Sequence, residues 1–64
     1  MKDLKTKVQE VVFIYTKMKK GTNLEEIGRL LNGYDAAEIA VEVDNLVKED
    51  QIIIENEIIS LKQI

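Results

Sequence analysis

The sequence contains no cysteine, histidine, proline or tryptophan, and only 5% of its residues are aromatic. Without cysteine, disulfide bonds and thiolate metal sites are excluded, and without histidine only carboxylate and carbonyl oxygens remain as metal ligands. The same two absences remove the commonest nucleophiles and general bases, and the chain has no Gly-rich phosphate-binding loop. We therefore expect no enzymatic activity, no metal ion and no cofactor.

Long hydrophobic runs are also missing. No apolar stretch approaches the roughly 20 residues that a membrane span requires, and no signal-peptide pattern opens the chain. These features predict a cytoplasmic protein without membrane contact. With 64 residues, 45% of them hydrophobic, the chain is expected to form a single domain over residues 1–64 with a small core.

Charge is divided unevenly along the chain. Residues 1–20 hold six lysines against two acidic residues, a net charge of +4, whereas residues 21–64 hold three basic residues against ten acidic ones, a net charge of −7. Such an asymmetry determines which partners are attracted to which part of the surface.

Residues 36–49 have the clearest amphipathic pattern. At about 100° per residue, one arc is apolar and is predicted to face the core: Ala36, Ile39, Ala40, Val43, Leu46 and Val47. Asp35 is expected as the N-cap, with Glu38 three positions later as in a capping box. The opposite arc is predicted to carry no cation and to hold Glu38, Glu42, Asn45 and Glu49.

Residues 3–19 predict a first helix. Its apolar stripe consists of Leu4, Val8, Val11, Tyr15 and Met18, flanked by Val12 and Ile14. Phe13 lies outside this stripe and is either an isolated exposed aromatic, which is common, or a partner contact. The apolar arc is wider than a small domain can cover, so we expect a homodimer through this helix, antiparallel or offset. The alternative is that its N-terminal part frays.

Residues 24–32 predict a second, short helix. Gly21 is expected at the C-cap of the preceding helix, and Asn23 with Glu26 forms a capping box. The apolar face is formed by Leu24, Ile27, Leu30 and Leu31. Gly28 lies inside this helix, where it costs about 1 kcal/mol relative to alanine, and the close approach of another helix would justify it.

Residues 51–62 predict a β-hairpin with Glu55-Asn56 between its two apolar runs. With a two-residue turn, the core face consists of Ile52, Ile54, Ile59 and Leu61. Ile53 and Ile58 would then pair across the strands on the other face, where they are either exposed or covered by a partner. A longer loop would reverse these assignments.

The order of helix, extended link, helix, turn, helix and hairpin resembles the winged-helix family. Residues 21–31, GTNLEEIGRLL, are similar to that family's second helix, and residues 46–52, LVKEDQI, resemble the exit of its third helix into the wing. The family usually has glycine where Asp50 stands, and aspartate can adopt the left-handed conformation needed there. The resemblance implies an α+β fold, mainly α: a small winged helix of three helices followed by a hairpin wing.

The resemblance also implies DNA binding through the third helix, but the charges oppose it. Phosphate neutralisation requires lysine or arginine, and of the residues expected on that face only Asn45 could read a base, an adenine. The wing tip, with Glu55 and Glu57, is acidic as well. We therefore interpret the chain as a non-enzymatic interaction module that docks on a basic or apolar surface of a protein partner within nucleic-acid machinery. Its expected contacts are Phe13, Glu38, Glu42, Asn45, Glu49, Ile53 and Ile58.

Two other interpretations stay open. One is a small dimeric DNA-binding transcriptional regulator that uses an unusual orientation, with contacts from Lys17, Lys19, Lys20 and Asn45. The other is that the acidic face mimics DNA and occupies a partner's DNA site.

Overall fold

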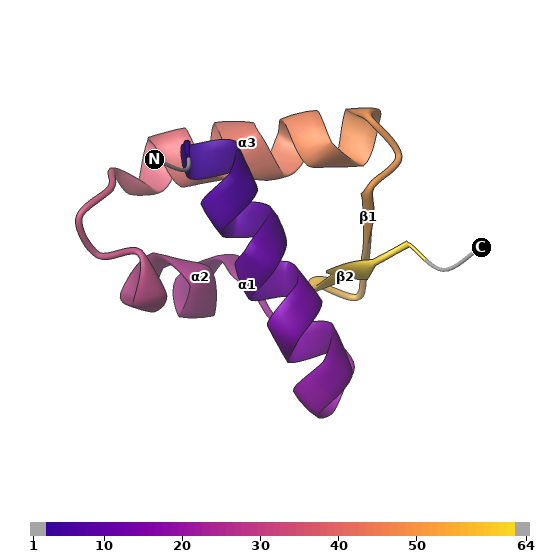
Figure 1. Cartoon of the computed structure of the whole chain (residues 1–64). Coiled ribbons are helices and arrows are strands. Elements are labelled where there is room, and N and C mark those ends of the chain that lie inside the picture. The colour runs from indigo at the N-terminus through magenta and orange to yellow at the C-terminus, as the bar shows by residue number, and fades with distance from the viewer. Residues whose placement is uncertain (1–2, 63–64) are drawn as a thin grey trace.

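The computed structural model describes residues 3–62 and shows three helices followed by an antiparallel hairpin (Figure 1). The elements are α1 (Leu4–Lys19), α2 (Leu24–Leu30), α3 (Ala36–Lys48), β1 (Ile52–Glu55) and β2 (Ile58–Leu61). The expected α+β, mainly helical layout with a winged-helix-like order is therefore confirmed. Residues 1–2 and 63–64 of the predicted domain lie outside the described part.

Side-chain caps begin all three helices. The Asp3 carboxylate accepts a hydrogen bond from Thr6 N at 2.9 Å, Asn23 accepts one from Glu26 N at 2.8 Å, and Asp35 accepts one from Ala37 N at 3.0 Å. Each bond satisfies a backbone donor that a helix start leaves open. The caps predicted at Asn23 and Asp35 are confirmed.

The ends of α2 and α3 come slightly earlier than the sequence suggests. Helix α2 stops at Leu30 instead of residue 32, because the chain turns there and Tyr34 N donates to the Leu31 carbonyl at 3.0 Å. Helix α3 stops at Lys48, one residue early. Asp50 then adopts the left-handed conformation, with φ of 67°, as the resemblance required.

The end of α1 differs from the prediction. The left-handed C-cap residue is Lys20, with φ of 80°, and Gly21 instead has φ of 154°. A Cβ at Gly21 would lie 2.6 Å from the Ile59 carbonyl oxygen, so glycine is needed for close approach to β2. Next to it, Thr22 exchanges two backbone hydrogen bonds with Ile59, at 2.8 and 2.7 Å. The expected reason for Gly28 was wrong, because a Cβ there would meet nothing within 4 Å.

The buried core draws on every element. It consists of Val8, Val12, Ile27, Ile39, Val43, Leu46, Ile52 and Ile59. On α1 the buried face is centred on Val8 and Val12, whereas Met18, predicted to be in the stripe, is 69% exposed. Strand β2 packs against the Val12 side of α1, where Leu61 N donates to Thr16 Oγ1 at 3.0 Å. This contact turns the core face of α1 away from Met18.

Helix α3 is also rotated relative to the prediction. Ile39, Val43 and Leu46 are buried, but Ala36 is exposed and Ala40 and Val47 are only half-buried. The assignment of Ala36 to the core was therefore wrong. The rotation brings the Glu42 and Asn45 side of the helix toward the protein body and turns Val41 outward.

The hairpin has a two-residue turn, but at Asn56-Glu57 rather than Glu55-Asn56. Both turn residues have positive φ, 51° and 67°, as a type I′ turn requires. Ile53 therefore pairs with Ser60, and Ile58 pairs with Glu55. The predicted direct pairing of Ile53 with Ile58 was wrong, although the two-residue shift leaves both on the same face of the hairpin.

Candidate interaction surfaces

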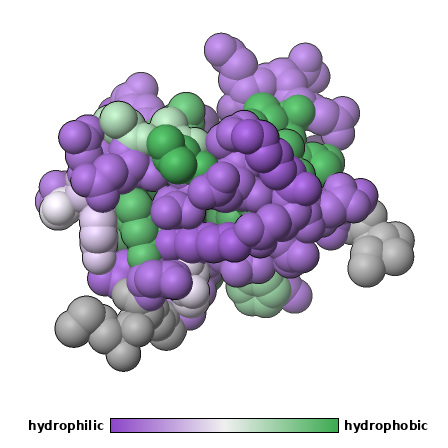
Figure 2. All heavy atoms as spheres, turned by 90° about the horizontal axis from the view of Figure 1, so that it is seen from above, coloured by the Kyte–Doolittle hydropathy of each residue, from purple (hydrophilic) through white to green (hydrophobic). Residues whose placement is uncertain are grey.

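The outward face of α3 is nearly neutral. It holds Ala37, Val41, Asp44 and Lys48, and Val41 is 57% exposed. Lys48 Nζ lies 3.0 Å from Asp44 Oδ2, so the cation of this face is already paired. Seen from the α3 side, hydrophilic surface dominates and hydrophobic atoms form separate patches (Figure 2). The sequence did not single out Val41, because its place depends on the helix rotation.

The four residues predicted for the acidic face lie along one flank of α3. Glu38 and Glu49 are exposed, whereas Glu42 and Asn45 are half-buried. Glu49 forms an ion pair with Lys5 at the start of α1, and the Asn45 amide donates to Glu42 at 3.3 Å. Much of this flank is therefore engaged within the protein, and Asn45 is poorly placed to read a base edge.

A groove runs between the start of α2 and the hairpin tip. Its volume is about 610 Å³, and its apolar lining includes Leu24, Ile54 and Ile58, each about half exposed. Its polar lining consists of Asn23, Glu25, Asn56 and Glu57. Leu24 and Ile54 were predicted to face the core, but both lie at the edge of the fold where the core no longer covers them.

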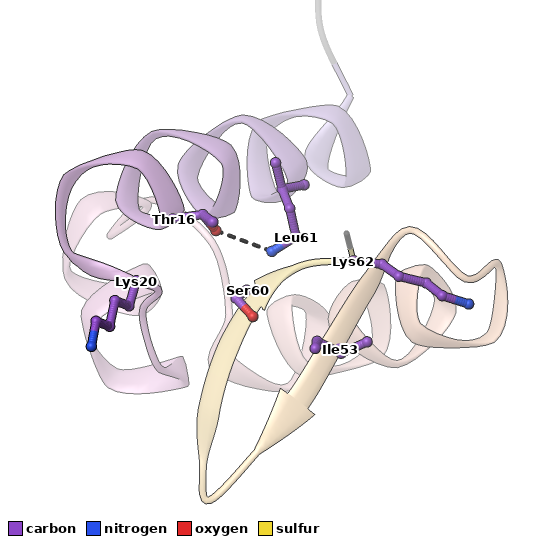
Figure 3. Close-up of a pocket in the computed structure, with 6 residues that line it drawn as sticks. All are labelled: Thr16, Lys20, Ile53, Ser60, Leu61 and Lys62. Atoms are coloured by element: carbon purple, nitrogen blue, oxygen red, sulfur yellow. Dashed lines mark hydrogen bonds between the residues drawn. The ribbon is translucent and has the colours of Figure 1, made fainter. Parts of the chain in front are cut away.

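A second groove of about 440 Å³ separates the C-terminal half of α1 from the hairpin (Figure 3). Ile53 and Ser60 lie on its hairpin side, while Lys20 and Lys62 project in different directions at its two ends. Lys62 Nζ lies 2.5 Å from Asp50 Oδ2. Ile53 and Ile58, predicted as one contact patch, thus line two different grooves.

The lysines near the end of α1 are partly engaged. Lys19 Nζ lies 2.6 Å from Glu26 Oε2 and 5.0 Å from the Tyr15 ring centre, while Lys17 Nζ lies 5.1 Å from the Phe13 ring centre. This end of α1 points away from α3 in Figure 1. The structure therefore does not bring Asn45 together with the three lysines proposed as nucleic-acid contacts.

The solvent side of α1 forms a surface that we call the α1 ridge, consisting of Glu10, Phe13, Ile14, Lys17 and Met18. All five residues are exposed, Phe13 by 47% and Ile14 by 52%. The sequence analysis placed Phe13 outside the apolar stripe, Met18 within it and Ile14 at its flank.

Among residues 3–62, two carboxyl groups have a pKa below the usual value. The pKa of Glu26 is lowered mainly by the hydrogen bond from Lys19 and then by the one from Thr22 Oγ1, at 2.6 Å. The pKa of Asp3 is lowered by its cap to Thr6. Both shifts come from structural bonds that join or start helices, so neither indicates a catalytic group.

Within residues 3–62, no group of three or more acidic side chains is arranged to hold a metal ion. In the same part of the chain, none of the helices has the length and apolar character needed to cross a membrane.

No protein-family model, curated protein or solved structure matches this chain.

Proposed function

We propose that this protein is a non-enzymatic, winged-helix-like module that docks a partner protein in the groove between α2 and the hairpin tip. The observation that carries this proposal is the groove itself. Leu24 of α2, Ile54 of β1 and Ile58 of β2 bring half-exposed aliphatic side chains together from three elements. An apolar lining within a polar rim is typical of a binding site.

Charge around the groove favours a basic partner. Glu57 lies along it, and Glu55 is next to the turn. Glu25 also lines the groove, but it adds little attraction because Arg29 Nη2 lies 2.5 Å from Glu25 Oε1 and balances its charge. The proposed occupant is therefore a segment of a protein, within nucleic-acid machinery, that carries apolar side chains flanked by lysine or arginine.

Binding of DNA through α3 is disfavoured on the same electrostatic grounds. Counterion release requires basic groups that can reach phosphates, and the outward face of α3 offers Lys48 already paired with Asp44. Titration of labelled mixed-sequence duplex DNA should show no binding tighter than about 10 μM at physiological salt, well outside the range of specific complexes. A reproducible submicromolar affinity with a steep salt dependence would overturn the proposal.

The groove is tested by matched substitutions. A partner recovered with the wild-type protein should be purified and titrated against Ile54→Glu, Ile58→Glu and the control Val41→Glu, which alters a residue of similar exposure outside the groove. Both groove variants should weaken binding at least about tenfold, equivalent to 1.4 kcal/mol, while the control binds as wild type. Equal loss in all three variants would contradict docking in the groove.

A dimeric DNA-binding regulator is the second candidate, and the position of Lys20 favours it. Lys20 lies at one end of the groove between α1 and the hairpin, and among the described residues it forms no ion pair. If the DNA titration did show binding, Lys20→Glu and Lys17→Glu should reduce its salt slope.

A further inference from the structure

Along the α1 ridge, two oppositely charged residues flank two apolar residues. An acid, Glu10, stands at one end and a cation, Lys17, at the other, and Phe13 and Ile14 lie between them. The midpoint between positions 10 and 17 falls between Phe13 and Ile14. At 100° per residue, Glu10 and Lys17 lie near the centre of the exposed arc, with Phe13 and Ile14 on its two sides.

This order is self-complementary under a two-fold rotation. If two copies of α1 pack antiparallel about an axis through that midpoint, Glu10 of each copy meets Lys17 of the other. The same rotation places Phe13 against Phe13 and Ile14 against Ile14. The two-fold axis is perpendicular to the plane that contains both helices, so residues on one side of the ridge contact residues on the same side of the second copy. A parallel pairing would instead place like charges opposite each other, which is destabilising.

We infer that the α1 ridge binds a second copy of this chain in that antiparallel arrangement. Half-exposed Phe13 and Ile14 form the apolar centre, and Met18, 69% exposed, extends it at both ends. The two Glu10–Lys17 contacts fix the orientation and register of the helices. This surface is separate from the groove at the hairpin tip, so each proposal can fail without the other.

Sedimentation equilibrium on the full chain tests the association. The interface is small, so association in the low-affinity range is expected. The apparent mass should rise from the 7.3 kDa of one chain toward twice that value between about 10 and 500 μM. A single species with the mass of one chain throughout this range would overturn the inference.

Charge reversal separates the proposed pairing from other modes of association. Glu10→Lys alone or Lys17→Glu alone places like charges at both ionic contacts of a homodimer, so each variant should stay monomeric where the wild-type protein dimerises. An equimolar mixture of the two variants restores both contacts and should form a heterodimer. Dimerisation of either single variant at wild-type strength, or no association in the mixture, would contradict the antiparallel register.

Two controls keep the result interpretable. Both substituted positions are exposed, and circular dichroism should show that each variant keeps the helical content of the wild-type protein. Should a variant unfold, Ile14→Glu tests the same ridge at its apolar centre and should also prevent association. Ile54→Glu changes an isoleucine of similar exposure on β1 and should leave the dimer unchanged, and a dimer weakened by this control would count against the ridge.

Discussion

Gly21 shows how one residue can connect two parts of the fold. Its backbone has φ of 154°, and its missing side chain leaves room for the Ile59 carbonyl oxygen and the Ile58 side chain. Gly21→Ala should lower stability by about 1–3 kcal/mol from the backbone conformation alone, and the clash with β2 adds to this. Thermal denaturation should show a fall of about 4–8 °C per kcal/mol for a domain of this size.

Gly28 provides the matched control for this substitution. It lies inside α2, and a Cβ there would meet nothing within 4 Å. Gly28→Ala should therefore raise stability by up to about 1 kcal/mol, because alanine has the higher helix propensity. A Gly21→Ala variant at least as stable as the wild-type protein would show that the close approach of β2 does not explain the glycine at this position.

Local chemistry predicted several residues well, and the exceptions have a common cause. Asn23 and Asp35 cap their helices as expected because caps depend on short-range bonding, and Asp50 adopts the left-handed conformation that the family resemblance implied. Lys20 and Glu57 adopt positive φ without any such preference. Lys20 immediately precedes the segment that pairs with β2 through Thr22 and Ile59, and Glu57 is in the turn set by the pairing of β1 with β2. Both pairings join residues that lie apart in the sequence, so the local pattern at Lys20 and Glu57 does not reveal them.

At the scale of elements, the sequence predicted which helices exist but not how each is rotated. An apolar repeat of about 3.6 residues identifies the apolar arc of a helix. Which part of that arc is buried depends on how the neighbouring elements pack against it. On α1, β2 packs against the Val12 side and leaves Ile14 and Met18 exposed. On α3, the rotation moved the acidic residues to a flank and Val41 to the outward face. This is why the α1 ridge and the hairpin-tip groove could not be predicted.

Glu26 links the start of α2 to the end of α1. Its carboxylate accepts hydrogen bonds from Lys19 and Thr22, and these bonds lower its pKa. A lowered pKa in the folded state gives stability that is present above the pKa of the unfolded chain and is lost as the pH falls through the folded value. The protein should therefore become less stable on acidification between about pH 6 and pH 3.

Glu26→Gln should remove part of this pH dependence. The amide cannot ionise, so the urea midpoint of the variant should fall less than that of the wild-type protein over the same acidification. Asp3 also has a lowered pKa, and it remains in both proteins, so its contribution cancels in the comparison. Identical pH dependence in the two proteins would show that the Glu26 contacts add no stability.

At the scale of the whole molecule, the apolar core is small for the number of elements it joins. Its eight buried residues come from all three helices and both strands, and Leu46 is completely buried among them. Leu46→Ala should cost about 2–5 kcal/mol. A domain of this length is expected to have only about 3–10 kcal/mol in total.

The Leu46→Ala variant should therefore be largely unfolded at room temperature, which circular dichroism and urea titration would measure. Val41→Ala is its control on the same helix, because Val41 is 57% exposed and its truncation should change stability by less than about 0.5 kcal/mol. A Leu46→Ala melting curve equal to that of the wild-type protein would mean that α3 does not hold the other elements together. If Leu46→Ala unfolds while Val41→Ala keeps the stability of the wild-type protein, the stability of the molecule depends on the buried face of α3 and not on its outward face.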